Sequence, residues 1–153
     1  MGGKCCFFIG HREADESLYV SLEKTIERHI TQYGVTIFIV GGYGGFDRLA
    51  SRILVELKKK YPSIQLFRLL VYHPGERPIK TPKGFDGTIY PPDMERVPRK
   101  AAIIRANRYM VDHADYLIAY AWHSASNARN LLEYACRRAK SGKLNVMNLY
   151  EEE

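Results

Sequence analysis

The sequence predicts a single α/β domain, 1–153, of the Rossmann-like type, with a mainly parallel sheet of about five strands and helices on both faces. Short apolar segments rich in β-branched and aromatic residues alternate along the chain with segments whose apolar residues recur every three or four positions. The short segments are almost continuously apolar, which is typical of parallel strands covered on both sides. A chain of 153 residues is also long enough for one well-buried core, because this size buries roughly 70% of the unfolded surface.

The predicted strands are residues 5–9, 35–40, 66–72, 116–120 and 145–149. Between them, apolar stripes at helical spacing predict helices over residues 18–30, 49–57, 101–113 and 128–139. Strands that alternate with helices indicate right-handed crossovers, and therefore a parallel sheet.

Segment 73–98 interrupts this alternation. It contains six of the seven prolines in the chain and shows no helical pattern. Loops of this length in compact domains are usually functional or disordered. We expect a partly ordered flap over the ligand site, with a solvent-exposed loop or an oligomer contact as the alternatives.

The net charge of +6 favours anionic partners, but it does not identify nucleic acid. The basic runs 58–60 and 137–143 lie near the ends of predicted helices, where the helix dipole favours cations. No apolar run reaches the ~18 residues of a membrane span, and the first residues do not resemble a secretory signal. Cys5, Cys6 and Cys136 lack metal-site spacing, so we expect buried, reduced cysteines, no metal and a cytoplasmic location.

In an open parallel sheet, ligands bind beyond the carboxyl ends of the strands. The first predicted strand ends in "FIGHRE", residues 8–13. Gly10 permits a tight exit, Arg12 can bind a phosphate through two hydrogen bonds, and His11 can donate another. The alternative is that Arg12 forms a surface ion pair with an acidic neighbour: Glu13, Asp15 or Glu16.

The second predicted strand ends in "IVGGYGGFDRLA". Its four glycines, Gly41, Gly42, Gly44 and Gly45, match neither the GxGxxG fingerprint nor a P-loop. They still give a turn without side chains, through which backbone amides can reach a phosphate. Asp47 either caps the following helix or accepts a hydrogen bond from a ribose or base.

The strand at 116–120 is followed by "AWHSASNAR". Ser124, Ser126 and Asn127 precede a predicted helix, so they suit both N-capping and an anion cradle. Trp122 either stacks on a base or sugar or packs under the flap. Two further basic candidates, Arg105 and Arg108, share one face of the helix 101–113 with Asp112, so the alternative is a structural salt-bridge network.

Taken together, "FFIGHRE", "GGYGGFDRLA" and "RANRYMVDHADYLIAYAWHSASNARNLLEYA" resemble the SLOG superfamily, most closely its YpsA-like branch, over nearly the whole chain. The resemblance to cytokinin-activating phosphoribohydrolases and to DNA-processing protein A is more distant. The resemblance to the SLOG superfamily implies a Rossmann-like fold that binds nucleotides or nucleotide derivatives at its strand ends. The implied ligand residues are Gly10, His11, Arg12, Gly41, Gly42, Gly44, Gly45, Asp47, Ser124, Ser126 and Asn127.

One departure from the family separates the possible functions. Phosphoribohydrolase relatives carry PGGxGTxxE in the third turn, whereas this chain reads "HSASNARNL". Aligning Ser126 with the threonine puts Arg129 in the place of the glutamate, and Glu133 lies a full turn further on. Spacing reveals no Ser-His-Asp triad and no pair of catalytic carboxylates.

We therefore expect a nucleotide-binding sensor or regulator, with a nucleotide-type ligand, no other implied cofactor and a homodimer as a guess from the helix faces. One alternative is an N-glycosidic nucleotide phosphoribohydrolase with Asp47 or Glu133 as the acid or base. Another is a protein that binds single-stranded nucleic acid through its basic surface and Trp122, although the basic residues do not interleave with aromatic residues.

Overall fold

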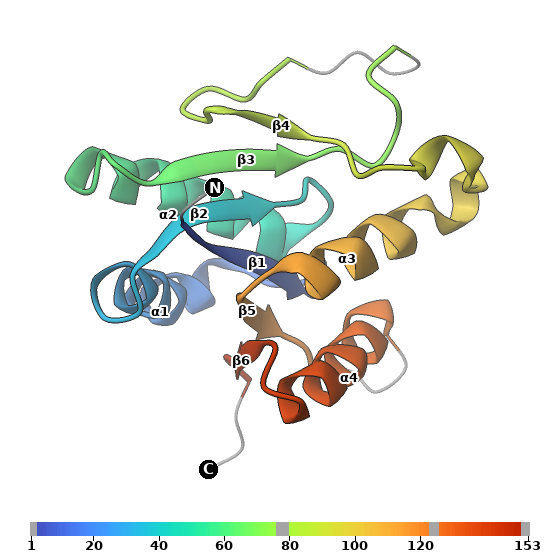
Figure 1. Cartoon of the computed structure of the whole chain (residues 1–153). Coiled ribbons are helices and arrows are strands. Elements are labelled where there is room, and N and C mark those ends of the chain that lie inside the picture. The colour runs from blue at the N-terminus through green and yellow to red at the C-terminus, as the bar shows by residue number, and fades with distance from the viewer. Residues whose placement is uncertain (1–2, 76–79, 123–125, 151–153) are drawn as a thin grey trace.

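A parallel sheet forms the centre of the protein, and α-helices cover both of its faces (Figure 1). The computed structural model describes residues 3–75, 80–122 and 126–150, and in these residues the sheet has six strands. The predicted α/β, Rossmann-like class is therefore confirmed, with one strand more than expected.

The strands are β1 (Lys4–Gly10), β2 (Val35–Val40), β3 (Gln65–Leu69), β4 (Gly87–Ile89), β5 (Tyr116–Tyr120) and β6 (Asn145–Asn148). Their order across the sheet is β4-β3-β2-β1-β5-β6, and each pair is parallel. The chain runs outward from β1 to β4 and then returns to place β5 on the other side of β1. The topological switch point, where open sheets bind ligands, therefore lies between the carboxyl ends of β1 and β5.

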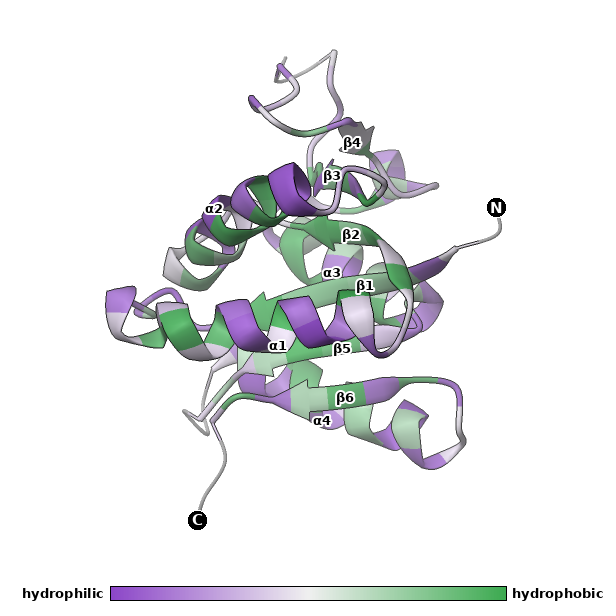
Figure 2. Cartoon of the chain, turned by 90° about the vertical axis from the view of Figure 1, so that its left-hand side faces the viewer, coloured by the Kyte–Doolittle hydropathy of each residue, from purple (hydrophilic) through white to green (hydrophobic). Residues whose placement is uncertain are grey.

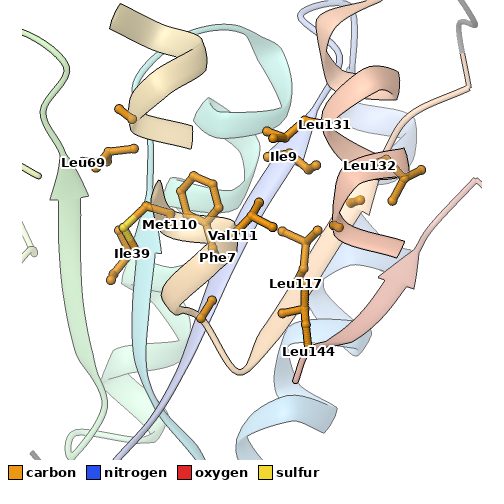
Figure 3. Close-up of a cluster of buried hydrophobic side chains, with 14 of the residues drawn as sticks. Phe7, Ile9, Ile39, Leu69, Met110, Val111, Leu117, Leu131, Leu132 and Leu144 are labelled. Carbon is orange, nitrogen blue, oxygen red and sulfur yellow. The ribbon is translucent and has the colours of Figure 1, made fainter. Parts of the chain in front are cut away.

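Helices α1 (Tyr19–Thr31) and α2 (Gly45–Lys60) cover one face, and α3 (Ala102–His113) and α4 (Asn127–Lys140) cover the other. Side chains alternate along β1, so that Cys6 and Phe8 pack towards α1 and α2 while Phe7 and Ile9 pack towards α3 and α4. Figure 3 shows the second of these clusters between β1, α3 and α4.

The helices are amphipathic, with apolar residues that recur at helical spacing, and this pattern in the sequence predicted them. In Figure 2 the central strands are mostly green, whereas α1 and α2 alternate between purple and green along their length, as amphipathic helices do. The last turn of α2 carries the run 58–60, and that of α4 carries Arg137, Arg138 and Lys140, with Lys143 just beyond its end, which confirms the placement of those charges near helix ends.

Part of the segment expected to be a flap completes the sheet. Strand β4 pairs with β3, and Met94, in the 3-10 turn Met94–Arg96, is only 4% exposed within the core. Strand β3 ends at Leu69, three residues earlier than predicted. A three-residue strand that contains a glycine carries no readable alternation, so only its pairing with β3 defines it. Residues 76–79 lie outside the described residues.

The cysteines differ partly from expectation. Cys6 is buried and Cys5 partly buried, and burial raises the pKa of the Cys5 thiol to about 12, but Cys136 is exposed on α4. Across residues 3–75, 80–122 and 126–150, no three His, Cys, Asp or Glu side chains are grouped to hold a metal ion. In the same ranges, no helix combines the length and apolarity needed to cross a membrane.

His29 gives the fold a predicted acid sensitivity. Its ring is 2% exposed, lies edge-on to Tyr33 and Tyr116, and donates from Nδ1 to the carbonyl of Thr25 at 2.7 Å. Burial lowers the pKa of His29 below its ordinary value of 6.5. The unfolded chain therefore binds the proton more readily, so stability is present at neutral pH and is lost as the pH falls below 6.5.

We expect this loss to reach about 1.4 kcal/mol for each pH unit between 6.5 and the lowered pKa of His29. Urea unfolding of the wild type and His29→Gln between pH 5 and 7.5 measures it. The free energy of unfolding of His29→Gln should fall less than that of the wild type as the pH is lowered. Parallel pH profiles for the two proteins would show that His29 does not cause the loss.

Candidate functional site

A cavity of about 490 Å³ opens beyond the carboxyl ends of β1 and β2, between the turns that follow them and the N-terminal halves of α3 and α4. This is the edge of the sheet at which a ligand was expected. Residues from five parts of the chain meet there: the end of β1 with the turn after it, the turn after β2 with the start of α2, the end of β3, residues 100–108 and the first turns of α4. The cavity thus joins segments that are far apart in sequence.

The structure brings most of the predicted ligand residues to this cavity. Those that line it are Gly10, His11, Arg12, Gly41, Asp47, Arg108, Ser126 and Asn127. Predicted residues that do not line it are Gly42, Gly44, Gly45, Arg105 and Trp122. Ser124 lies outside the described residues.

The glycine turn packs against the turn after β1. The amide of Gly45 donates to the carbonyl of Arg12 at 2.9 Å, and that of Phe46 donates to the carbonyl of His11 at 3.3 Å. A Cβ built on Gly45 would lie 2.2 Å from the carbonyl oxygen of Ala14. These first two amides of α2 are thus already bonded within the protein, so the close approach that Gly45 permits is to the neighbouring turn.

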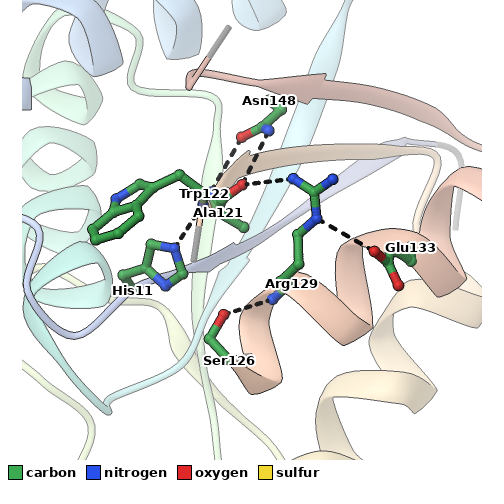
Figure 4. A network of polar contacts seen from close by, with 7 residues as sticks. All are labelled: His11, Ala121, Trp122, Ser126, Arg129, Glu133 and Asn148. Atoms are coloured by element: carbon green, nitrogen blue, oxygen red, sulfur yellow. Dashed lines mark hydrogen bonds and ion pairs between the residues drawn. The ribbon is translucent and has the colours of Figure 1, made fainter. Parts of the chain in front are cut away.

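His11 joins the two strands at the switch point (Figure 4). Its backbone amide donates to the carbonyl of Tyr120 at 3.1 Å, and the amide of Trp122 donates to its Nε2 at 2.7 Å. The side chain is 4% exposed. Because Nε2 accepts a hydrogen bond, it carries no proton, so the expected donation from His11 to a ligand can come only from Nδ1.

Trp122 does not line the cavity itself but contacts His11, which does. The two rings meet edge-on with their centroids 4.9 Å apart, and the indole is 42% exposed. Its ring also lies 6.2 Å from that of Tyr150. The indole therefore packs on the histidine that lines the cavity. None of the described residues of the segment 73–98 lines the cavity, so a flap over the site is not observed in them.

Arg129 belongs to a structural network below the switch point (Figure 4). Its Nη1 donates a hydrogen bond to the carbonyl of Ala121 at 3.4 Å. The same carbonyl accepts a hydrogen bond from the side-chain amide nitrogen of Asn148. Its Nε lies 3.4 Å from the exposed carboxylate of Glu133. Neither Arg129 nor Glu133 lines the cavity, so Glu133 is not placed to act on a ligand there.

Asp47 is the acidic side chain at the glycine turn. The N-cap of α2 is Gly44, with a φ of 105°, so Asp47 is not the cap. As the third residue of the helix, its Oδ2 instead accepts a hydrogen bond from the amide of Tyr43 at 3.1 Å. Burial raises the pKa of Asp47 from 3.8 to about 7, against the opposing effect of the Tyr43 hydrogen bond and of Arg68.

Arg12 is exposed at the mouth of the cavity. Within the described part of the chain Arg12 forms no ion pair with Glu13, Asp15 or Glu16: Glu16 pairs with Arg52, and Asp15 accepts hydrogen bonds from Ser17. The surface ion pair considered from the sequence is therefore not observed for Arg12.

The basic face of α3 divides into two parts. Arg108 lines the cavity, and its guanidinium lies 4.5 Å from the centre of the Tyr134 ring. Asp112 accepts a hydrogen bond from the hydroxyl of Tyr134 at 2.6 Å and lies 3.7 Å from Nε of Arg138. Arg105 is exposed and lies outside the cavity lining. Asp112 thus forms a structural network with α4, whereas Arg108 faces the site.

Ser126 confirms the predicted N-cap of α4, because its Oγ accepts a hydrogen bond from the amide of Arg129 at 3.0 Å. The sequence did not identify several other lining residues: Tyr43, Lys100, Ile104, Asn107 and Asn130. Periodicity shows which face of a helix meets the sheet, but it does not show which end of that helix borders a cavity. The exposure of Ile104, an apolar residue that is 46% exposed on α3, is visible only in the structure.

The fold and the cavity together define a Rossmann-like α/β domain with a ligand-sized cavity beside its topological switch point, within the usual range of about 300–1,000 Å³. In comparisons with known proteins, no family model matches the chain and no curated protein matches it. A function for the protein is therefore inferred from the residues that line the cavity.

Proposed function

We propose that this protein binds a nucleotide or a nucleotide derivative in the cavity at the switch point, as a sensor or regulator of the SLOG type. The observation that carries the proposal is the cavity lining, in which three cations, Arg12, Lys100 and Arg108, stand beside an apolar wall. A nucleotide has the matching composition, because it joins an anionic phosphate to a flat, largely apolar base.

The cations suit the phosphate. Arg12 and Arg108 carry planar guanidinium groups that bind phosphate oxygens through two parallel hydrogen bonds, and Lys100 adds a third positive charge. The acidic residues of the lining are Glu13 and Asp47, and burial raises the pKa of Asp47 to about 7. The lining therefore carries an excess of positive charge near neutral pH.

The rest of the lining suits the nucleoside. Apolar side chains come from both the sheet and α3, namely Ile9, Leu69, Val71, Ile103 and Ile104. Three amide side chains, those of Asn107, Asn127 and Asn130, can both donate and accept hydrogen bonds. Groups of this kind recognise the hydroxyls of a ribose and the edge of a base.

Removal of a cavity cation is expected to weaken nucleotide binding. Arg12→Ala and Arg108→Met should each raise the Kd by about tenfold or more, since a hydrogen bond to a charged group contributes roughly 1.5–3 kcal/mol. Calorimetric titration with AMP, ADP, ADP-ribose and a cyclic dinucleotide measures the effect. Arg105→Met, on the same helix but outside the cavity, is the matched control and should leave the Kd unchanged. Absence of binding by the whole panel, or unchanged binding by both cavity variants, would refute the proposal.

Hydrolysis of the N-glycosidic bond of a nucleotide is a second candidate, because Asp47 lines the cavity and titrates near neutral pH. A group with such a pKa can exchange protons with a substrate at physiological pH. Chromatography of nucleoside monophosphates incubated with the protein decides between the two functions. Release of free base would establish an enzyme, and its absence with every nucleotide tested would leave binding alone.

A further inference from the structure

Arg68 is a cation that belongs to none of the sequence motifs and does not line the cavity. It lies at the carboxyl end of β3, and its side chain projects to the α2 face of the sheet, opposite to that of Leu69. The residue is half-buried and its Nε is fully buried. None of its nitrogen donors forms a hydrogen bond or an ion pair with any described residue.

The neighbouring acids do not neutralise Arg68. Asp86 lies 3.3 Å from Nζ of Lys58 and accepts a hydrogen bond from the amide of Leu66 at 2.8 Å. Asp47 attracts Arg68 electrostatically but lies beyond ion-pair distance, with its carboxylate bonded to the turn at Tyr43. The ring of Phe85 lies beside the guanidinium, with its centre 5.3 Å from Cζ of Arg68.

The buried Nε of Arg68 is unfavourable without a partner, because this donor has lost water without gaining an acceptor. Burial accordingly lowers the pKa of Arg68. A bound anion can supply the hydrogen-bond acceptor that such a donor lacks. The planar guanidinium of arginine has the geometry to bind two oxygens of a phosphate.

The glycine turn provides the space for that acceptor. A Cβ built on Gly42 would lie 2.9 Å from Nη1 of Arg68, so the turn lies directly against the guanidinium. Gly42 itself is exposed, and any side chain at this position would cover the nitrogen. The missing side chain at Gly42 therefore leaves Nη1 open at the same edge of the sheet as the cavity.

We propose that Arg68 and the turn at Gly42 form an oxyanion-binding subsite for a phosphate or pyrophosphate group. The subsite adjoins the cavity through Tyr43 and Asp47, which line the cavity and interact electrostatically with Arg68. Its phosphate has two possible sources, a free ion or the second phosphate of a nucleotide bound in the cavity. The subsite goes beyond the proposed nucleotide binding and does not require it.

Thermal unfolding in the presence of sodium pyrophosphate, at constant ionic strength, tests the subsite. Pyrophosphate should raise the unfolding midpoint of the wild type in a saturable way. Arg68→Met should weaken its binding by about tenfold or more. Without pyrophosphate, the midpoint of Arg68→Met should equal or exceed that of the wild type, because an unpaired buried charge has been removed. Arg137→Met, which removes an exposed charge from the last turn of α4, should respond as the wild type does.

Two further titrations identify the source of the phosphate. If Arg108→Met retains the pyrophosphate response that Arg68→Met loses, the subsite holds a free ion independently of the cavity. If Arg68→Met instead weakens binding of ADP but not of AMP, the subsite holds the second phosphate of the nucleotide. Pyrophosphate binding that depends on Arg68 in a protein that binds no nucleotide would support the subsite while refuting the proposed function.

Unchanged affinity of Arg68→Met for both pyrophosphate and ADP would overturn the proposal. So would a midpoint lowered by several degrees with the anion response intact, since Arg68 would then be a structural partner of Phe85. Should Arg68→Met fail to fold, Arg68→Lys decides, because lysine keeps the charge but not the fork. Weakened anion binding by this variant supports the subsite, and wild-type affinity overturns it.

Discussion

Replacement of Asp47 by asparagine is expected to stabilise the protein at pH 8 by up to about 4 kcal/mol, because the pKa of this carboxyl rises from 3.8 to about 7 on folding. In the unfolded chain Asp47 ionises near pH 3.8, whereas in the folded protein it stays protonated to about pH 7. Its stabilising contribution is therefore complete below pH 3.8 and is lost as the pH rises through 7.

Asparagine does not ionise and keeps an oxygen that accepts the hydrogen bond from Tyr43. Urea unfolding at pH 4 and pH 8 should therefore show similar stabilities for Asp47→Asn and the wild type at the acidic pH and a clear gain for the variant at pH 8. Asp93→Asn changes an exposed carboxylate in the same way and should alter stability little. A loss of stability on replacing Asp47 at pH 8 would show that its carboxylate is stabilised in the fold.

The same variant separates the two candidate functions. If the protein only binds an anionic nucleotide, Asp47→Asn should bind it at least as tightly at pH 8, because a negative charge has left the cavity lining. If Asp47 transfers a proton in hydrolysis, turnover should fall by about 10²–10⁴-fold instead. Binding and product formation measured on one preparation at pH 8 distinguish these results.

Gly45→Ala is expected to destabilise the protein by about 3 kcal/mol or more, at the upper end of the usual cost of overpacking. The added Cβ would lie 2.2 Å from the carbonyl oxygen of Ala14 and 2.6 Å from that of Arg12. Both are backbone atoms, so no side chain can turn away to make room. The hydrogen bond from the Gly45 amide to Arg12, 2.9 Å long, would also be disturbed.

Gly34→Ala is the matched control for this prediction. Gly34 has a φ of 71° and no atom within 4 Å of a built Cβ, so alanine there meets backbone strain without a steric clash. We expect a loss of about 1–2 kcal/mol for Gly34→Ala. Chemical denaturation of the three proteins gives both values, and equal losses at the two positions would show that the two turns can separate at Gly45.

The sequence predicted the fold well because its evidence was periodic. The continuous apolar run of β1 and the four-residue spacing in α1 reflect contacts of the sheet with the helices on its two faces, and such contacts extend over whole elements. Strand β4 was missed because three residues are too few to show a pattern, and its hydrogen bonds to β3 depend on a chain crossing that local sequence does not encode.

The site was predicted less completely, for a related reason. Residue type identified Arg12 and Asp47 as polar residues at a strand end, and both line the cavity. Type alone did not distinguish the amide of Gly45, which is bonded within the protein, from one open to a ligand. Arg68 was overlooked because it lies inside a predicted strand, and its lack of partners appears only when the surrounding elements are in place.

The hydrogen bond between His11 and Trp122 gives the protein an internal optical reporter. Trp122 is the one tryptophan of the chain, so the intrinsic indole emission comes from a single position. Its amide is held by the ring of His11, whose chain neighbour Arg12 lies at the mouth of the cavity. A ligand that moves the turn after β1 therefore shifts the surroundings of this indole, and the change in fluorescence follows occupancy without any attached dye.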